Sequence, residues 1–254
     1  MKFLLVTLFL LSAVFFLPDF AHAGEVTFLS TQSSATDAAS YTFSTVSIGD
    51  AAADRYIIGF CSILSTSRTI TGVKINNVYL ATTTITSIDT FQFVGVANVP
   101  LGTTGDLVVN HDNGANATSV SCDLYRVTQL ADVAPNTHIR DATNGVSNLD
   151  LAPAVGAGNT AFIIGHAMQI SSDSETGTWV GLTEQTDANT EAPNGLYHTT
   201  AFATFTVEGT VDISITPTNV NAQRGIAAAW EYTTAGAGAG GATVASSQII
   251  WDEN

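Results

Sequence analysis

Short runs of Val, Ile, Thr, Phe and Tyr, bounded by Gly, Asn, Asp and Pro, recur from residue 25 to residue 232. Such runs predict β-strands. Residues 204–208 and 212–216 alternate apolar and polar side chains, as half-buried strands do. Apart from a short helical turn predicted at 51–54, no window has a helical period. The predicted strands are 25–30, 41–48, 55–64, 70–75, 79–88, 91–97, 106–111, 118–128, 149–152, 160–170, 178–183, 196–206, 211–216 and 223–232.

The second half of this strand pattern repeats the first. The segment 55–60 (RYIIGF) matches 161–166 (AFIIGH). Three more matches follow in the same order, 72–73 with 179–180, 105–109 with 209–213, and 123–127 with 228–232. All four have offsets between 104 and 107 residues. The chain therefore reads as two pseudo-repeats of about four to five strands each.

These repeats predict an all-β fold, a two-sheet β-sandwich of jelly-roll or Greek-key type. A single unit would expose one apolar sheet face, so we expect the two units to face each other in one domain over residues 24–233. Two separate small sandwiches are the alternative. The segment 129–158 would then be a linker, although Leu149-Asp150-Leu151 resembles a further strand.

The first 23 residues are typical of a secretory leader. Lys2 precedes an apolar run over residues 3–17, and Ala21-His22-Ala23 forms a small-x-small cleavage site. Cleavage would leave Gly24 as the first residue, with no transmembrane anchor, because no second apolar stretch approaches spanning length. We expect a secreted protein, extracellular or on the cell surface.

Two cysteines, Cys61 and Cys122, lie in the first unit, one in its first and one in its last long strand. In a Greek-key unit the fourth strand returns beside the first. Together with an oxidising compartment, this predicts a Cys61–Cys122 disulfide. The alternative is a pair of buried thiols. The repeat aligns Cys61 with Ala167 and Cys122 with Ala227, which indicates tight sites in both units.

Charge is scarce and acidic. The chain has 7 Lys+Arg, 22 Asp+Glu and a net charge of −15, and only 11% of its residues are charged. Nucleic-acid binding needs clustered basic residues, so this class of partner is not expected.

The C-terminal end differs from the rest. Residues 234–242 form an Ala/Gly-rich linker, and residues 243–254 form a tail with Ile249, Ile250 and Trp251 followed by two acidic residues. The tail either docks on the chain's own sheet or is presented to a partner as a strand. The second alternative predicts self-association.

Motifs that specify a reaction were not found. The sequence has no Gly-x-Ser-x-Gly, no His-Glu-x-x-His and no Cys-x-x-Cys, and we expect no enzyme and no cofactor. His166 lies within an apolar strand, which favours a buried, hydrogen-bonded histidine over a ligand. His111 precedes a turn and is expected to be exposed. Tyr125 and Trp230 occupy matching positions of the repeat and are predicted core residues.

One stretch does suggest a binding site. It combines acidic residues with aromatic ones, as sites for sugars and Ca²⁺ do. Its spacing fits no known calcium loop, so the identity of any metal stays unknown, and solvated acidic loops are the simpler interpretation. A hydrolase whose carboxylates meet only in the fold is a further alternative. The candidate residues are Asp173, Glu175, Trp179, Asp187, Glu191 and Tyr197.

Four segments carry a resemblance to a known group of proteins. Residues 46–56, 99–106, 124–128 and 179–184 resemble a pattern of uncharacterised β-sandwich proteins of phages and aquatic bacteria, spanning about residues 41–232. The resemblance implies structural roles in virions or at cell surfaces and brings no catalytic residues. The leader departs from phage virion proteins, which are not exported.

Together these patterns predict a secreted structural or adhesive β-sandwich, a subunit of a surface or extracellular assembly. The alternative is a lectin-like glycan-binding module, with or without Ca²⁺.

Overall fold

The structure is a computed structural model. It describes residues 24–64, 70–86, 90–112, 117, 119–141, 147–150, 152, 160–171, 176–189, 195–206, 209–217 and 224–233. One compact unit spans Gly24–Thr234. The predicted leader, the Ala/Gly linker and the tail lie outside the described residues.

The first half of this unit forms two antiparallel sheets. Sheet I has the strand order β1-β9-β3-β7-β6, and sheet II has the order β2-β8-β4-β5. The strands are β1 (Val26–Ser34), β2 (Ser40–Ser47), β3 (Arg55–Leu64), β4 (Ile70–Ile75), β5 (Val78–Tyr79), β6 (Ala81–Thr86), β7 (Thr90–Asn98), β8 (Thr104–His111) and β9 (Ser119–Thr128).

The second half forms two more. Sheet III has the order β10-β17-β12-β15-β14, and sheet IV has the order β11-β16-β13. The strands are β10 (Thr137–Asp141), β11 (Ser147–Asn148), β12 (Ala161–Ser171), β13 (Gly177–Val180), β14 (Thr183–Asn189), β15 (Gly195–Phe205), β16 (Ser214–Pro217) and β17 (Arg224–Glu231).

The two halves share one topology. Taken in chain order, the strands of sheet III occupy the same positions as the strands of sheet I, and those of sheet IV match three strands of sheet II. In both halves the long strand that opens the sequence repeat, β3 or β12, lies at the centre of the five-stranded sheet. The internal repeat in the sequence is thus a repeat of architecture.

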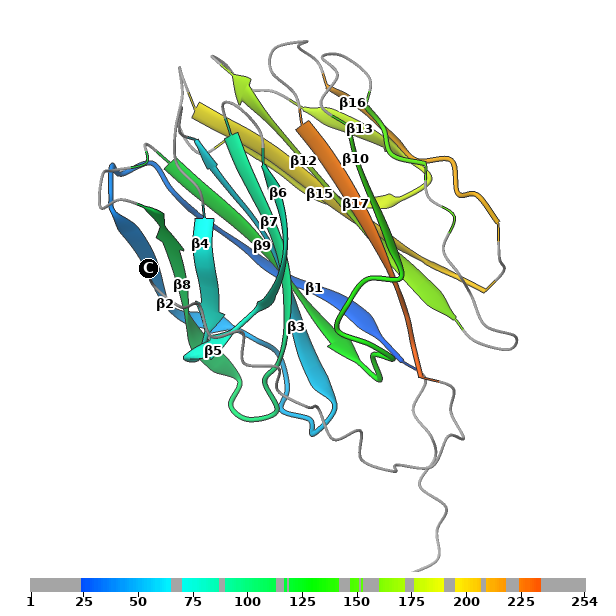
Figure 1. Ribbon diagram of the computed structural model, residues 1–254, viewed down its shortest axis with the longest axis horizontal. Helices are drawn as coiled ribbons and strands as arrows, with labels where there is room; N and C mark the ends of the chain where they lie inside the picture. The colour runs from blue at the N-terminus through cyan, green and yellow to red at the C-terminus, as the bar shows by residue number, and fades with distance from the viewer. Residues whose placement is uncertain are drawn as a thin grey trace, which may run out of the picture. The chain divides into compact units, whose positions relative to one another are not determined.

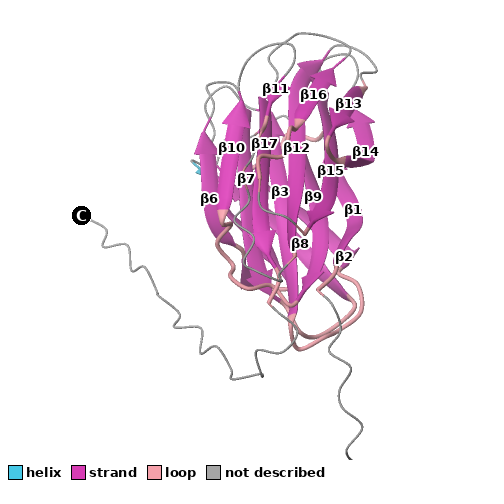
Figure 2. Ribbon diagram, turned by 90° about the vertical axis from the view of Figure 1, so that its right-hand side faces the viewer, coloured by secondary structure: helices cyan, strands magenta, loops and turns pink. Residues whose placement is uncertain are grey.

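The four sheets are layered in the order II, I, III, IV (Figure 1). Three apolar cores fill the spaces between them. Sheets I and II enclose a core around Ile57 and Leu107, and sheets III and IV enclose one around Ile163 and Ile215. The central core joins sheet I to sheet III and contains the ring pair Phe162 and Trp230, which stack with centroids 5.6 Å apart. Figure 2 shows the strands of all layers running along one common direction.

The all-β sandwich class predicted from the sequence is confirmed, with four sheets in place of two. Each half of the fold, β1–β9 or β10–β17, covers one face of its five-stranded sheet with its own smaller sheet. The other face of the five-stranded sheet packs against the other half. The expectation that two bare sheets face each other therefore describes only the middle of the molecule. Tyr125 and Trp230 belong to this central core, as predicted.

Several strand boundaries differ from the prediction. The predicted strand 79–88 is divided into β5 and β6, residues 51–54 contain a turn, and Leu149 follows β11 as a buried loop residue. Two strands were missed, β10 (THIRD) and β14 (TEQTDAN). Both are edge strands, where polar side chains are common, so they lack the apolar run that marks a central strand.

Cys61 and Cys122 form a disulfide with their Cα atoms 4.1 Å apart. They are directly opposed on the neighbouring antiparallel strands β3 and β9, which is the strand neighbourhood predicted from the Greek-key argument. Both sulfurs lie in the core between sheets I and II. In the second unit Ala167 is paired with Gly225, two residues before the Ala227 that the sequence alignment matched to Cys122.

Candidate functional site

Polar side chains gather between sheets I and III, at the centre of an otherwise apolar layer. Successive residues of a strand point to opposite faces, so Cys122 points toward sheet II while Asp123 points toward sheet III. We define the central cluster as six residues from five strands of both units. They are Thr31 (β1), Ser62 (β3), Ser121 and Asp123 (β9), His166 (β12) and His198 (β15).

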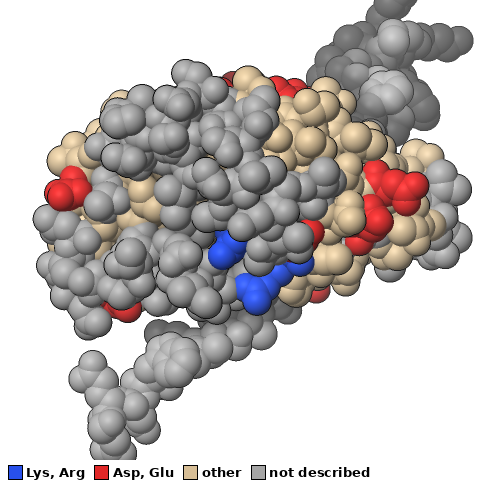
Figure 3. All heavy atoms as spheres, turned by 90° about the horizontal axis from the view of Figure 1, so that it is seen from above, with Lys and Arg blue, Asp and Glu red and all other residues tan. Residues whose placement is uncertain are grey.

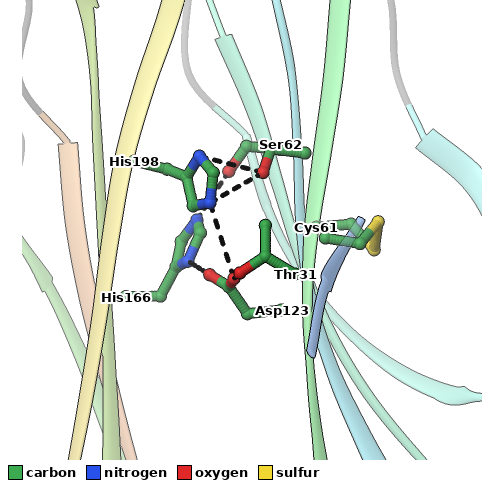
Figure 4. Close-up of a disulfide and its surroundings, with 8 residues drawn as sticks. Thr31, Cys61, Ser62, Asp123, His166 and His198 are labelled. Carbon is green, nitrogen blue, oxygen red and sulfur yellow. Dashed lines mark hydrogen bonds and ion pairs between the residues drawn. A yellow bond between two sulfur atoms is a disulfide. The ribbon is translucent and has the colours of Figure 1, made fainter. Parts of the chain in front are cut away.

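His166 is held between two residues of the other unit. Its Nδ1 lies 2.9 Å from Oδ2 of Asp123, and its Nε2 lies 2.9 Å from Oγ of Ser62 (Figure 4). Nδ1–H donates to the carboxylate. In the neutral ring Nε2 then accepts the hydroxyl proton of Ser62. Each ring nitrogen of His166 therefore has a partner.

A second histidine lies beside the first. The rings of His166 and His198 stack with centroids 6.1 Å apart. Nε2 of His198 is 3.5 Å from Oδ1 of Asp123, and the hydroxyl of Ser121 is within 3.0 Å of Nδ1. Thr31 donates its hydroxyl to the same Oδ1 at 2.6 Å. Asp123 therefore has partners from three other strands.

Two further hydrogen bonds beside the central cluster also connect sheet I with sheet III. Thr200 (β15) donates to the carbonyl oxygen of Gly165 at 2.8 Å, which uses its only proton. Tyr125 (β9) must then donate to Oγ1 of Thr200, 2.7 Å away. Burial, with the charge of Asp123, raises the pKa of Tyr125 well above its usual value, so the phenol stays protonated.

The carboxyl of Asp123 is ionised although it is completely buried. Burial alone would raise its pKa. The charge of His198, together with hydrogen bonds from His166 and His198, outweighs the burial and holds the pKa of Asp123 well below its usual range. The cluster thus contains a negative charge whose two histidine partners come from the opposite unit, while Thr31 of its own unit also donates to it.

In its order of atoms, Ser62–His166–Asp123 corresponds to the nucleophile, base and orienting acid of serine hydrolases. A substrate has to reach the side chains of an active site, whereas these three side chains are buried. Ser62 and Asp123 are 0% exposed and His166 is 1% exposed. Ser62 also lies within a central strand instead of on an open turn. In this conformation the three side chains join sheet I to sheet III by hydrogen bonds.

The site predicted from the sequence is only partly within the described residues. Asp173, Glu175 and Glu191 lie outside them. Asp187 and Tyr197 meet, because the Tyr197 hydroxyl donates to Oδ1 of Asp187 at 2.6 Å. Burial and the contact with Asp187 raise the pKa of Tyr197.

The two aromatic residues of that site face the interior. Trp179 is 8% exposed and Tyr197 is 2% exposed. The indole Nε1 of Trp179 donates to Oγ1 of Thr199 at 2.9 Å, inside the second sandwich. Neither ring therefore offers an open face on which a sugar would stack. A glycan-binding site in this region would depend on other side chains.

The central cluster was missed at the sequence level except for His166, which is buried and hydrogen-bonded as predicted. His111 was expected to be exposed, and this is wrong. It is buried, because its Nε2 reaches the carbonyl oxygen of Ala38, 2.8 Å away. A signal for the cluster did exist. Ser62 interrupts the apolar run of β3, and Asp123 is a charged residue in the middle of β9, a strand that is buried along most of its length.

Among the described residues, no group of three or more His, Cys, Asp or Glu side chains is placed to hold a metal ion. The calcium hypothesis rested on Asp173, Glu175 and Glu191 as well as Asp187, and most of these lie outside that part of the chain.

Comparisons with known proteins add little. No protein-family model matches the chain, and no curated protein matches it. A conserved protein of unknown function, PA5104 from Pseudomonas aeruginosa PAO1, is 11% identical and aligns over 83% of this chain and 89% of its own, with a TM-score of 0.26. The PBSX exported protein XepA is 10% identical, with 82% and 86% covered and a TM-score of 0.20. Likeness at this level carries no argument about fold or function.

Proposed function

We propose that the chain is a secreted structural or adhesive protein, a subunit of a surface or extracellular assembly. The observation that carries this proposal is the central cluster. Its serine, histidines and carboxylate, the side chains best suited to catalysis, are used to join two sandwiches. A body built in this way is suited to bearing load and presenting surfaces.

The covalent and sequence features agree with export. The disulfide joins the neighbouring strands β3 and β9 of sheet I, and such bonds persist in oxidising compartments. Residues 1–23 are typical of a leader, which supports a mature chain that begins at Gly24. In the described part of the chain, no helix has the length and apolar character needed to cross a membrane.

Assembly is assigned to the C-terminal tail. Ile249, Ile250 and Trp251 follow an Ala/Gly-rich linker, so the tail can reach beyond its own unit. Burial of one such side chain stabilises a contact by about 1.5–3 kcal/mol. Three of them contribute about 4.5–9 kcal/mol before the cost of association is subtracted, so assembly at micromolar concentrations also needs contacts from the rest of the tail.

The mature protein, residues 24–254, should therefore self-associate, and removal of residues 243–254 should abolish this association. The melting temperature should stay almost unchanged, because the tail is proposed to bind a neighbouring copy and not its own sandwich. Sedimentation velocity over a range of concentrations measures the first effect and calorimetry the second. A full-length protein that stays monomeric at high concentration would contradict the proposal, as would a truncated one that still assembles.

A further inference from the structure

Gln92 on β7 carries a buried carboxamide whose nitrogen is unpaired. The residue is 3% exposed, and among the described residues its Nε2 has no hydrogen-bond partner. Val94, two residues farther along the strand, belongs to the central core, so Gln92 points into the same layer between sheets I and III. An unpaired amide in such a place destabilises the fold, so its presence needs an explanation.

The residue opposite Gln92 on the next strand is Ser62. The two are directly paired in the antiparallel strands β3 and β7. Ser62 faces the central layer as well, because its hydroxyl reaches His166 of sheet III. The Cβ atoms of such a pair lie about 4.5–5.5 Å apart. Four bonds of about 1.5 Å each, from Cβ of Ser62 through Oγ, Cδ and Cγ to Cβ of Gln92, can cover this distance.

The hydroxyl of Ser62 is in contact with a base. It donates to Nε2 of His166 at 2.9 Å, and Asp123 holds Nδ1 of the same ring (Figure 4). The acidic side chains in view in Figure 3 lie at the surface, where water screens them, whereas Asp123 is 0% exposed and acts on the ring at close range. A histidine held in this way activates a serine hydroxyl as a nucleophile.

Burial keeps substrates in solution away from this serine, but a carboxamide of the same layer is already beside it. We infer that Ser62 and Gln92 form an intramolecular ester bond that cross-links β3 to β7. This inference goes beyond the proposed function, because it concerns the sandwich and does not depend on the tail.

The reaction is a single acyl transfer within the chain. Oγ of Ser62 attacks Cδ of Gln92 while the hydroxyl proton passes to Nε2 of His166. The Oγ–Cδ bond forms and the Cδ–Nε2 bond of Gln92 breaks. His166 gives the proton to the departing nitrogen, which leaves as ammonia, so the ring ends in its neutral form and no co-reactant is consumed. The buried layer then excludes the water that would hydrolyse the ester.

Two other described residues each have one half of this arrangement. Ser121 also contacts a histidine, but its opposed residues on β1 and β3 are both serines, so no carboxamide lies beside it. Gln169 is 1% exposed and its amide lacks partners, but it is opposed to Tyr197, whose hydroxyl is bound to a carboxylate. The pair Ser62 and Gln92 combines both halves.

The ester completes a covalent frame around the central strand of sheet I. Cys61 links β3 to β9 on the face toward sheet II. Ser62, the next residue, links β3 to β7 on the face toward sheet III. Since β9 and β7 are the two neighbours of β3 in the sheet, the strand is bonded on both sides. Force applied to the first unit then acts on covalent bonds as well as on hydrogen bonds.

Mass spectrometry of the purified mature protein tests the inference. The ester lowers the intact mass by about 17 Da, the ammonia that is released, in addition to the two hydrogens lost in the disulfide. Trypsin separates residues 56–68, which include Ser62, from residues 75–126, which include Gln92. After reduction of the disulfide these two peptides should remain joined. Neutral hydroxylamine, which cleaves esters and leaves peptide bonds intact, should then separate them.

Five variants locate the bond and its base, with circular dichroism as the check that each is folded. Ser62→Ala and Gln92→Met should have the full mass, whereas Gln169→Met, the matched control, should still lose ammonia. His166→Ala should stop the reaction and His198→Ala should not. A purely structural role of the two buried histidines does not produce this difference.

The inference is wrong if the parent protein keeps the mass of its sequence apart from the disulfide. It is equally wrong if the loss of ammonia persists in the S62A or H166A variant. Self-association is measured separately, so either result leaves the proposed function standing.

Discussion

Replacing Asp123 with alanine should lower the free energy of unfolding by about 3–5 kcal/mol, the usual cost of removing one partner from a buried ion pair. The substitution leaves His166 and His198 without their carboxylate, in a layer where both are almost fully buried. Urea titration followed by tryptophan fluorescence measures the effect. Asp132→Ala is the control, because Asp132 is exposed and accepts one local hydrogen bond, so its loss should cost less than about 1 kcal/mol.

The same residue should produce a defined pH dependence. Because the pKa of Asp123 is lowered in the folded state, its contribution to stability is present above the unfolded value of about 4 and is lost as the pH falls further. Asp123→Asn should lack this part of the acid destabilisation. If the Asn variant and the parent lose stability in parallel between pH 5 and pH 2, the carboxylate has no ionic role in the cluster. This measurement also applies if the alanine variant does not fold.

Removing the disulfide should have an effect of similar size. Cys61 and Cys122 are 61 residues apart, and closing a loop of that length restricts the unfolded chain by about 4 kcal/mol in the chain-entropy model. The double variant C61A/C122A should lose about this much stability and keep the fold, because the core between sheets I and II tolerates two small side chains. The second unit already has Ala167 and Gly225 at the matching positions.

Dithiothreitol provides the control for this prediction. It should destabilise the parent protein to the level of the double variant and leave the double variant unchanged. A parent protein whose unfolding is the same with and without reductant would show that the bond contributes little, and the loop-closure argument would then be wrong.

The fold class was predictable because its signals are local. Strands of Val, Ile and Thr between turn residues mark each element, and the repeat of 55–60 in 161–166 reveals the duplication. The Cys61–Cys122 neighbourhood followed from strand order alone. The edge strands β10 and β14 were not recognised, since an edge strand presents polar side chains to solvent and lacks the apolar run used to detect it.

The layering and the central cluster depend on which sheet faces are covered and on contacts between residues far apart in the sequence. Whether two repeats share two sheets or build four depends on which faces are covered, and both arrangements need the same apolar strands. Ser62 and His166 are 104 residues apart in the chain, and no local pattern states that they meet. The polar interruptions at Ser62 and Asp123 mark positions that need partners, but they do not say which partners.

In this duplicated fold the central cluster can determine how the two sandwiches are aligned. Two apolar sheet faces can slide past each other at little cost, whereas a charged group buried between them is satisfied in one register only. Asp123 of the first unit meets His166 and His198 of the second, and Tyr125 meets Thr200. Within the central core these contacts specify how the two sandwiches are aligned.

We propose that Ser62, His166 and Asp123 join the sandwiches and do not act on a substrate. A fluorophosphonate probe for activated serines, followed by peptide mass spectrometry of the native mature protein at pH 7, tests it most directly. A serine hydrolase of known activity serves as the positive control. We expect no adduct at Ser62, which is 0% exposed within β3. A stoichiometric adduct on Ser62 that disappears in His166→Ala would show an accessible, activated nucleophile and would contradict the account.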